Sequence, residues 1–459
     1  MTRIETDICV IGAGSAGLSV AAGAVQMGAK VVLIEAGEMG GDCLNTGCVP
    51  SKALLHASAE GLDWDAAHAH VRRTIETIAP HDSVERFEGL GVTVLKGFAR
   101  FTGPREVDVD GTRIDARRFV IATGSSPATP PIPGLDKVPF ETNETIFSLG
   151  ERPGHLLIIG GGPVGLEMAQ AHRRLGSQVT VIDAAPILSR EDPEAVALIR
   201  DALAGEGVRF VEGHGVERVT GSPGDIRVDV DANGQHADTW RGTHLLIAAG
   251  RSPNVDDLGL EAAGVAYSRR GIKVDAALRT TNRRVYAIGD VIGGAGFTHL
   301  AGYQVGIVVR SALFGLPARA RTDHIPRAIY TTPELAQVGL TEAEARGAHG
   351  PAVEVVRADI AANDRAVATG QSDGFLKVMV VKGRPVGATF VGENAGEQIA
   401  LWALALSSRL KMSAIAGAVL PYPTMAELSK RAAGAYFSPR LFGNVWVKRV
   451  VKAVQRLLP

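Results

Sequence analysis

The hydrophobic pattern of the chain contains one unit twice. The first copy begins with the apolar run ICVI and the second with LLII. In each copy a glycine-rich turn follows, then a stretch with helical periodicity, and then a second apolar run, VVLI or VTVI, which ends on an acid. Short apolar runs bounded by turn signals are typical of buried strands. The pattern therefore predicts two strand–helix–strand units of an α/β protein.

A single offset of 148 residues superposes the two copies. It aligns the glycines of two G-x-G-x-x-G motifs, and it aligns Glu35 with Asp183. In such a motif the first glycine makes a tight turn, the second lets the backbone approach a pyrophosphate, and the third lets helix and strand pack closely. The pyrophosphate sits at the helix start, and the acid bonds a ribose hydroxyl. Two motifs in register predict two dinucleotide-binding sites, with the glycines Gly12, Gly14 and Gly17 in the first and Gly160, Gly162 and Gly165 in the second.

Composition and charge narrow the class of protein. The 459 residues suggest two to four domains. The balance of 48 Lys+Arg against 49 Asp+Glu argues against binding of nucleic acid. No apolar run approaches the ~20 residues that cross a bilayer, and the N-terminal MTRIETDICV has no features of a signal peptide. We therefore predict a cytoplasmic protein without a nucleic-acid partner.

Two of the three cysteines lie close together in GGDCLNTGCVPSK. Four residues separate Cys43 and Cys48, and we expect a helix to begin at Pro50, so the pair lies where a helix dipole lowers a thiol pKa. A structural disulfide is disfavoured in the cytosol, and with Cys9 the chain has too few cysteines for a four-ligand zinc site. Two inert thiols would leave the flanking Gly-Gly and Pro-Ser-Lys unexplained. The pair therefore predicts a redox-active dithiol and no metal site.

This segment resembles the signature of the flavoprotein disulfide reductases, the family of dihydrolipoamide dehydrogenase, glutathione reductase and mercuric reductase. Further motifs follow in that family's order: ATGSSP, AAGRSPN, VYAIGDV and YTTPELAQVGLTE. The resemblance implies two Rossmann-like dinucleotide-binding domains, for FAD and NAD(P), and a C-terminal α+β dimerisation domain. We expect an FAD-binding domain at 1–148, an NAD(P)-binding domain at 149–270, a central part completing the FAD site at 271–322, and the dimerisation domain at 323–459.

The same resemblance implies roles for individual residues. Hydride would pass from the nicotinamide to FAD, and electrons would leave through the cysteine pair. Cys48 matches the thiolate beside the flavin, and Cys43 matches the interchange thiol that attacks the substrate. Lys52 and Glu167 match an ion pair near the flavin. The other cofactor-binding residues implied in this way are Thr123, Gly124, Asp290, Thr298 and His299 for FAD, and Gly250 and Arg251 for the nicotinamide nucleotide.

The end of the second repeat predicts which nicotinamide nucleotide is used. Asp183 stands where a carboxylate accepts hydrogen bonds from a ribose 2′-OH and repels a 2′-phosphate. The next residues read AAP, and the nearest arginine, Arg190, is farther on. We therefore predict NADH rather than NADPH. The same reasoning assigns Glu35 to the adenosine ribose of FAD.

One position departs from the family's usual C-terminal motif. H-P-T-x-x-E reads YPTMAE here, from Tyr422 to Glu427. In the family this motif reaches the other subunit's active site, which implies a homodimer, and its His–Glu pair moves the proton of the interchange thiol. A phenol has a pKa of about 10 and is a poor base at neutral pH. Mercuric reductase also has tyrosine here, but no cysteine follows Cys48 to match the C-terminal cysteine pair of that enzyme.

The leading interpretation is an NAD(P)H-dependent FAD disulfide oxidoreductase of mercuric-reductase-like type. Its electron acceptor, a small molecule or a protein, is not identified by the sequence. Two alternatives stay open. One is a dihydrolipoamide dehydrogenase that tolerates Tyr422, and the other is a redox-sensing or partner-binding flavoprotein with little turnover.

The C-terminal segment has its own pattern. No acidic residue follows Glu427, and apolar residues recur at helical spacing from Val445 onward: Trp446, Val450, Val454, Leu457 and Leu458. The pattern predicts a basic amphipathic helix. Such a helix can pack on its own dimer, or it can lie in the interface of an anionic membrane and make the protein membrane-associated. The sequence leaves both open.

Overall fold

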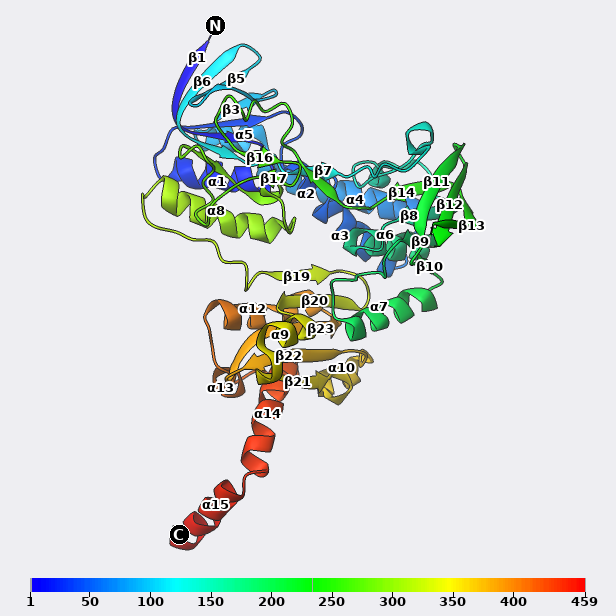
Figure 1. The fold of residues 1–459 in the computed structure, drawn as a ribbon, viewed down its shortest axis with the longest axis vertical. Helices are drawn as coiled ribbons and strands as arrows, with labels where there is room; N and C mark the ends of the chain where they lie inside the picture. Colours follow the sequence, from blue (N-terminus) through cyan, green and yellow to red (C-terminus); the bar gives the residue numbers. More distant parts are fainter. Residues whose placement is uncertain (1, 233, 459) are drawn as a thin grey trace. The chain divides into compact units, whose positions relative to one another are not determined.

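The computed structural model describes residues 2–232 and 234–458 and divides into two compact units (Figure 1). Unit 1 contains the chain up to Ile187 and the segment Gly207–Arg321. Unit 2 contains the segment Leu188–Glu206 and the chain from Thr322 onward. The predicted NAD(P)-binding domain begins at 149 and ends at 270. Both of these boundaries lie inside unit 1, and they stay predictions.

The first half of unit 1 is built on a seven-stranded sheet. Its strand order is β3–β2–β1–β6–β5–β4, and β18 also pairs with β6. The strands from the apolar runs are parallel to their neighbours, as the strand–helix–strand pattern predicts, whereas β4 and β5 are antiparallel. The strands are β1 (Arg3–Ile11), β2 (Val31–Glu35), β3 (Thr93–Lys96), β4 (Arg100–Gly103), β5 (Glu106–Val109), β6 (Thr112–Ile121) and β18 (Val285–Ala287).

Helices and a short hairpin complete this half. Helix α1 follows the first glycine-rich turn and packs beside α8, and α2 and α3 carry the cysteine pair. The elements are α1 (Ser15–Gln26), α2 (Gly41–Asn45), α3 (Cys48–Ala59), α4 (Trp64–Ile78), α5 (Val84–Gly89), α8 (Thr298–Ala312), β16 (Tyr267–Ser268) and β17 (Gly271–Ile272).

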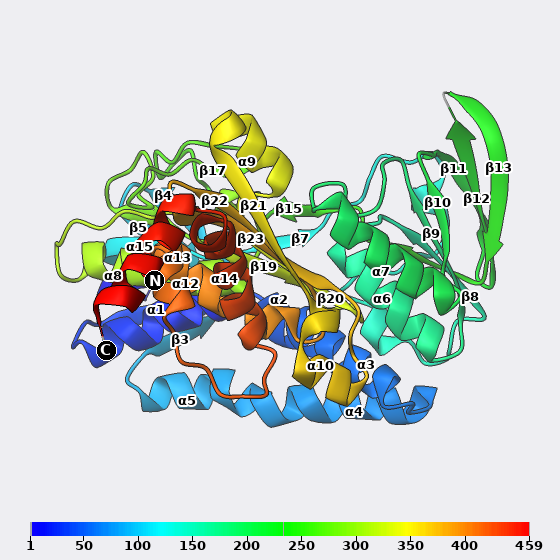
Figure 2. The same ribbon diagram turned by 90° about the horizontal axis from the view of Figure 1, so that it is seen from below.

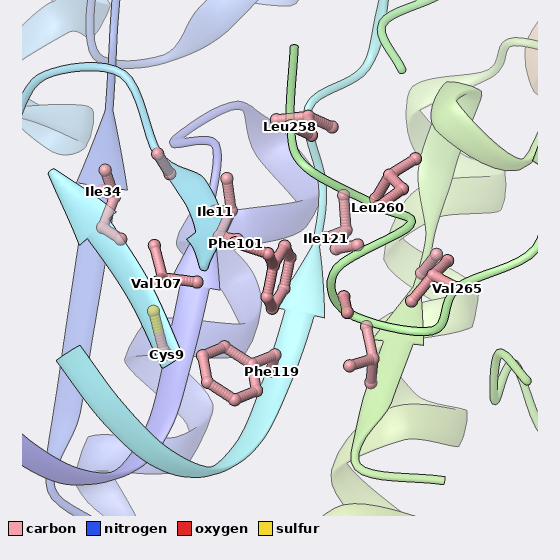
Figure 3. Close-up of a cluster of buried hydrophobic side chains, with 14 of the residues drawn as sticks. Cys9, Ile11, Ile34, Phe101, Val107, Phe119, Ile121, Leu258, Leu260 and Val265 are labelled. Carbon is pink, nitrogen blue, oxygen red and sulfur yellow. The ribbon is translucent and has the colours of Figure 1, made fainter. Parts of the chain in front are cut away.

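The third cysteine belongs to the core of this half. Figure 3 shows the sulfur of Cys9 on β1 among buried side chains that include Ile34, Val107 and Phe119. Cys9 is fully buried, and burial raises the pKa of its thiol far above the usual range. It is therefore an inert apolar residue of the core, and the reactive thiols are Cys43 and Cys48.

The second half of unit 1 repeats the first on a smaller scale. Its four-stranded sheet, in the order β10–β9–β8–β14, is entirely parallel. A three-stranded antiparallel sheet, β11–β12–β13, lies at the outer side of this half in both views (Figures 1 and 2). The elements are β8 (His155–Ile159), α6 (Pro163–Arg174), β9 (Gln178–Asp183), β10 (Arg209–Glu212), β11 (Gly215–Ser222), β12 (Asp225–Ala232), β13 (Gln235–Gly242) and β14 (His244–Ile247).

The two halves of unit 1 are joined by a two-stranded antiparallel sheet that the sequence did not predict. It pairs β7 (Ser125–Pro127), from the motif ATGSSP, with β15 (Arg251–Pro253), from the motif AAGRSPN. The two motifs, one from each half of unit 1, therefore pair with each other. This pairing brings residues of both predicted cofactor sites together.

Unit 2 is built on a five-stranded antiparallel sheet with helices packed against it. The strand order is β19–β20–β23–β22–β21. The strands are β19 (Pro326–Ile329), β20 (Glu334–Gly339), β21 (Val353–Asp359), β22 (Phe375–Val381) and β23 (Arg384–Gly392). The helices are α7 (Pro193–Gly205), α9 (Glu342–His349), α10 (Asp364–Thr369), α11 (Ala395–Gln398), α12 (Ala400–Ser407), α13 (Met412–Ala416), α14 (Glu427–Phe442) and α15 (Val445–Leu457).

A buried ion cluster explains why α7 belongs to unit 2. The Lys377 ammonium on β22 lies 3.0 Å from Asp192 and 2.9 Å from Glu194, at the start of α7, and 3.2 Å from Glu342 on α9. Removing one partner of such a cluster leaves buried charge uncompensated. The segment had been expected in the NAD(P)-binding domain, and the cluster ties it to the C-terminal sheet instead.

The two glycine-rich turns have the same backbone geometry. Gly12 and Gly160 have φ of +101° and +120°, which favours glycine. A Cβ on Gly17 would lie 1.8 Å from the carbonyl oxygen of Gly12, and a Cβ on Gly165 would lie 2.0 Å from that of Gly160. Each helix therefore packs against its own turn at a distance that only hydrogen allows, which is the role predicted for the third glycine.

We expect Gly17→Ala to destabilise unit 1 by about 3 kcal/mol or more, because the new methyl group must displace backbone. A lower thermal midpoint and a lower FAD content of the purified protein would measure this. Gly23→Ala on the same helix is the matched control, since its Cβ would meet only Val309 at 3.7 Å. The control should change stability by at most about 1 kcal/mol. Equal behaviour of the two variants would contradict the proposed close approach.

Candidate active site

The cysteine pair lies where two short helical segments meet. Cys43 is inside α2, and Cys48 is the first residue of α3. The helix thus begins two residues before Pro50, earlier than expected, because Gly47 rather than the residue before proline is the N-cap. Both residues are free thiols in the structure. The prediction that the pair lies at a helix start is confirmed, and this position stabilises a thiolate.

A threonine hydroxyl links both sulfur atoms. The Oγ1 of Thr298, the first residue of α8, lies 3.4 Å from the Sγ of Cys43 and 3.6 Å from the Sγ of Cys48. The sequence assigned Thr298 to the flavin, and its contact with the dithiol was not predicted. The residue is 250 positions from Cys48, so no local pattern could have indicated the contact.

The two thiols have different proton affinities. A hydrogen bond from Cys43 lowers the pKa of Cys48 to about 6, assisted by Thr298 and by the positive charge of Lys52, although burial opposes the shift. The same hydrogen bond, together with burial and the charge of Cys48, raises the pKa of Cys43 far above its usual range. At neutral pH the pair is therefore one thiolate, Cys48, and one thiol, Cys43. This agrees with the roles that the sequence assigned to them, which stay predictions.

The predicted ion pair of Lys52 and Glu167 is confirmed. The Nζ of Lys52 on α3 lies 2.7 Å from the Oε2 of Glu167 on α6. The carboxylate is only 5% exposed, so the pair is held in a partly dry environment where its charges interact strongly. It joins the two halves of unit 1, because it links α3, the helix that begins with Cys48, to α6. That it lies near the flavin stays a prediction.

The two acids at the ends of the repeats make the same hydrogen bonds. Each accepts from the backbone N–H of the residue after the first glycine, and from the N–H two residues beyond itself. The offset of 148 residues therefore holds for the hydrogen bonds as well as for the sequence. Glu35 accepts from the N–H groups of Ala13 and Gly37. Asp183 accepts from the N–H groups of Gly161 at 2.7 Å and Ala185 at 2.8 Å.

The starts of α1 and α6 fit the phosphates of two dinucleotides. Gly14 and Gly162 are the N-caps of the two helices, and both have an extended backbone. Gly14 has φ −76° and ψ −178°, and Gly162 has φ −81° and ψ −178°. A Cβ on Gly162 would meet nothing within 4 Å, and one on Gly14 would meet only the Cα of Gly41 at 3.9 Å. Free N–H groups at a helix start facing open space form an anion site. The residues present thus fit a dinucleotide at each turn, and the assignment of FAD to the first and of the nicotinamide nucleotide to the second stays a prediction.

Arg251 lies on the FAD half of the unit rather than at the second glycine-rich turn. Its guanidinium donates to the hydroxyl of Ser125 at 2.7 Å and to its carbonyl at 2.6 Å, and it lies 3.4 Å from Asp42, next to Cys43. The Ser125 hydroxyl in turn donates to Asp290 at 2.7 Å. Asp290 is therefore held in place as a predicted FAD ligand, and Arg251 connects it to the cysteine loop. The sequence predicted neither Ser125 nor Asp42.

Three of the remaining predicted cofactor residues, Thr123, Gly124 and Gly250, lie next to the paired strands β7 and β15, and the fourth, His299, lies on α8. Asn254 holds Thr123 through two hydrogen bonds, of 2.8 Å and 2.9 Å, and its N–H donates to the carbonyl of Gly124 at 3.0 Å. The carbonyl of Gly250 accepts from the N–H of Ala128 at 3.0 Å. The ring of His299 stacks on Phe297 with 5.2 Å between centroids, a packing role. Asn254 was not predicted as a site residue, although it ends the motif AAGRSPN.

Tyr422 in unit 2 has an acidic partner that the sequence did not indicate. Its phenol donates a 2.7 Å hydrogen bond to Asp364, the first residue of α10, and Arg431 on α14 lies 3.5 Å from the same carboxylate. Hydrogen bonding to Asp364 and the charge of that carboxylate raise the pKa of Tyr422 above its usual value. Tyr422 is 68% exposed, and at neutral pH it is a protonated phenol that donates.

Glu427 keeps the place that the motif predicts but does not bind Tyr422. It is the first residue of α14, and within the described chain its buried Oε2 has no hydrogen-bond partner. Tyr422 and Glu427 therefore do not form a copy of the His–Glu pair. In its place stands a Tyr422–Asp364 pair, in which the phenol donates to the carboxylate.

A dithiol with one stabilised thiolate, flanked by two dinucleotide-binding turns, defines a flavin- and nicotinamide-dependent disulfide oxidoreductase. The chain belongs to the pyridine nucleotide-disulphide oxidoreductase family: residues 6–315 match that family, and residues 325–433 match its dimerisation domain. Membership confirms the predicted class of enzyme, an oxidoreductase that uses FAD and NAD(P)H and acts on a sulfur group.

Similar proteins cover nearly the whole chain. A mercuric reductase of Bacillus cereus is 36% identical over 450 residues, which span 93% of this chain and 71% of that one. A dihydrolipoyl dehydrogenase of Thermus scotoductus is 37% identical over 454 residues, 94% of this chain and 97% of that one. The Cu(II) complex of the HOCl-induced flavoprotein disulfide reductase RclA from Escherichia coli superposes with a TM-score of 0.87 at 30% identity, covering 94% and 99% of the two chains.

The contact of Thr298 with the thiols generates a prediction. In the reduced enzyme we expect Cys48 to be alkylated by iodoacetamide with a midpoint near pH 6, and Thr298→Val to move that midpoint toward pH 7, because a hydrogen bond to the thiolate is lost. Mass spectrometry resolves Cys48 from Cys43. Thr46→Val is the matched control, since its hydroxyl donates to Asp42 instead. A midpoint near pH 8.5 in the wild type would refute the assignment of the thiolate.

Proposed function

We propose that the protein carries electrons from NADH, through FAD, to the Cys43–Cys48 disulfide, and that a thiophilic acceptor takes them from the dithiol without a histidine relay. The observation that carries the proposal is the hydrogen-bonded pair of one thiolate and one thiol at the start of α3. When bound, FAD and the nicotinamide supply the two-electron chemistry. Two electrons and one proton convert the disulfide to the thiolate of Cys48 and the thiol of Cys43.

In this proposal the chain's own groups divide the work. Cys48 stays deprotonated because Cys43, Thr298 and Lys52 stabilise its negative charge. Cys43 keeps the proton and is the thiol that meets the acceptor. The open backbone at Gly14 and Gly162 holds the two pyrophosphates, and Glu35 and Asp183 hold the riboses.

The other side of the site is supplied by the C-terminal motif. The dimerisation domain supports a homodimer, in which the exposed Tyr422 of one subunit meets the dithiol of the other, as the family's motif does. Because Asp364 holds the phenol as a donor, Tyr422 does not accept the proton of Cys43. Acceptors that need this proton moved should therefore react slowly.

These properties favour a soft metal ion as the acceptor. A soft metal ion binds the thiolate of Cys48 directly and displaces the proton of Cys43 to water when that sulfur becomes a ligand, so no general base has to act while the electrons move. The similarity to mercuric reductase and to a reductase solved with Cu(II) supports this class. The similarity to dihydrolipoyl dehydrogenase and the retained Glu427 support a second candidate, a small disulfide or dithiol substrate.

Asp183 supports NADH as the electron donor. Both of its oxygens already accept backbone hydrogen bonds, which fixes the carboxylate at the end of β9 where a 2′-phosphate would be repelled. We expect kcat/KM for NADH to exceed that for NADPH by about tenfold or more, and Asp183→Ser to reduce this ratio. Glu35→Asp, at the equivalent position of the first repeat, should leave the ratio unchanged. A wild-type preference for NADPH would contradict the proposal.

A panel of acceptors at fixed NADH tests the acceptor class: lipoamide, glutathione disulfide, Hg(II), Cu(II) and quinones. We expect the wild type to favour the metal ions, and Tyr422→His to raise turnover with lipoamide at least about tenfold, since a positioned base contributes ~10²–10⁴. Turnover with metal ions should not rise. Cys43→Ser measures the background turnover, in which the acceptor is reduced without the dithiol.

Two controls make the result specific. Tyr422→Phe removes the hydroxyl without adding a base, so it should not raise lipoamide turnover. Tyr267→His makes the same change at an exposed tyrosine in unit 1. Rapid lipoamide turnover by the wild type would favour the second candidate. Metal-ion turnover that survives in Cys43→Ser would show that the dithiol is not the donor.

A further inference from the structure

Helix α15 lies outside the part of the chain that the family accounts for. The match to the dimerisation domain ends at residue 433, and α15 spans Val445–Leu457. Its start is well defined, because the side chain of Asn444 accepts from the N–H groups of Trp446 at 2.9 Å and Val447 at 3.4 Å. None of its thirteen residues is buried. Figure 1 shows the helix in red at the C-terminal end of the chain.

The helix has one wide apolar face and one basic face. Successive residues are turned by about 100°, which places the apolar side chains on one half of the wheel and the charged ones on the other. Trp446 is 72% exposed, Val450 60% and Leu457 81%. The opposite face carries Lys448, Arg449, Lys452 and Arg456, and the sequence has no acid after Glu427 to neutralise them.

An isolated helix of this length is marginal in water, so a partner that covers the apolar face would stabilise it. We propose that this partner is an anionic phospholipid surface. The apolar half of α15 would enter the boundary between headgroups and acyl chains, and the basic half would face the phosphates. Trp446 at one end of the apolar face suits the interfacial layer, where indole rings gather. This inference goes beyond the proposed redox function and does not depend on it.

Charge favours a lipid surface over a second copy of α15 as the partner. Two such helices packed by their apolar faces would leave both basic faces turned outward, without an acidic residue on either helix to pair with them. A lipid surface instead offers negative charge all around the helix. Among the described residues no helix is long and apolar enough to cross a bilayer.

Co-sedimentation of the FAD-loaded enzyme with vesicles tests the proposal. The vesicles are pure phosphatidylcholine, or phosphatidylcholine with one third phosphatidylglycerol. We expect binding to the anionic vesicles at low ionic strength, with at least tenfold weaker binding to the neutral ones and a marked loss in high salt. The fluorescence of Trp446, obtained as the difference between wild type and Trp446→Phe, should shift to the blue on binding.

A matched pair of substitutions separates the two faces of the helix. Val450→Glu and Gln455→Glu make the same change in net charge, on the apolar and the polar face. We expect Val450→Glu to weaken vesicle binding more than tenfold, and Gln455→Glu by about fivefold at most, the effect of one charge near a membrane surface. NADH oxidation in solution serves as the check that both variants are folded.

Three results would overturn the proposal. The first is no binding of the wild type to anionic vesicles. The second is equal binding by the two variants. The third is equal binding to neutral and anionic vesicles. If the first result comes together with dissociation of the dimer by Val450→Glu in light scattering, a second copy covers the face.

Discussion

The chemistry of unit 1 depends on one hydrogen bond, from the thiol of Cys43 to the sulfur of Cys48. It makes two neighbouring thiols unequal, so that one is a thiolate near neutral pH while the other keeps its proton. Cys43 lies in α2 and Cys48 begins α3 directly after it, and Thr298 at the start of α8 lies beside both sulfurs. Two segments 250 residues apart in the sequence therefore meet at one pair of sulfur atoms.

The scaffold that brings these segments together is a duplicated one. The offset of 148 residues relates the two glycine-rich turns, and it also relates the carboxylates that accept from the turn backbone. The contacts that join the halves include the pairing of β7 with β15 and the ion pair of Lys52 with Glu167. The second connection starts on the same helix as Cys48, so the junction of the halves lies beside the thiols.

Local patterns predicted much of this arrangement. The apolar runs, the glycine motifs and the cysteine spacing indicated both repeats, the dithiol and the class of fold, because each depends on neighbours in the chain. The partners of Thr298, Arg251 and Tyr422 were not predictable in this way. Each of these contacts joins residues at least 58 positions apart and involves single polar side chains, which carry no periodicity. The place of α7 in unit 2 was missed for the same reason, since it follows from the charges around Lys377.

The central claim is that electrons from NADH reach the disulfide of Cys43 and Cys48. The chain has three cysteines, and Cys9 is buried as a thiol, so a count of thiols tests the claim directly. The air-oxidised enzyme and the enzyme reduced anaerobically with NADH are unfolded in denaturant, and their free thiols are titrated. The account predicts one thiol per chain before reduction and three after it. One thiol in both samples, or three in both, would contradict it.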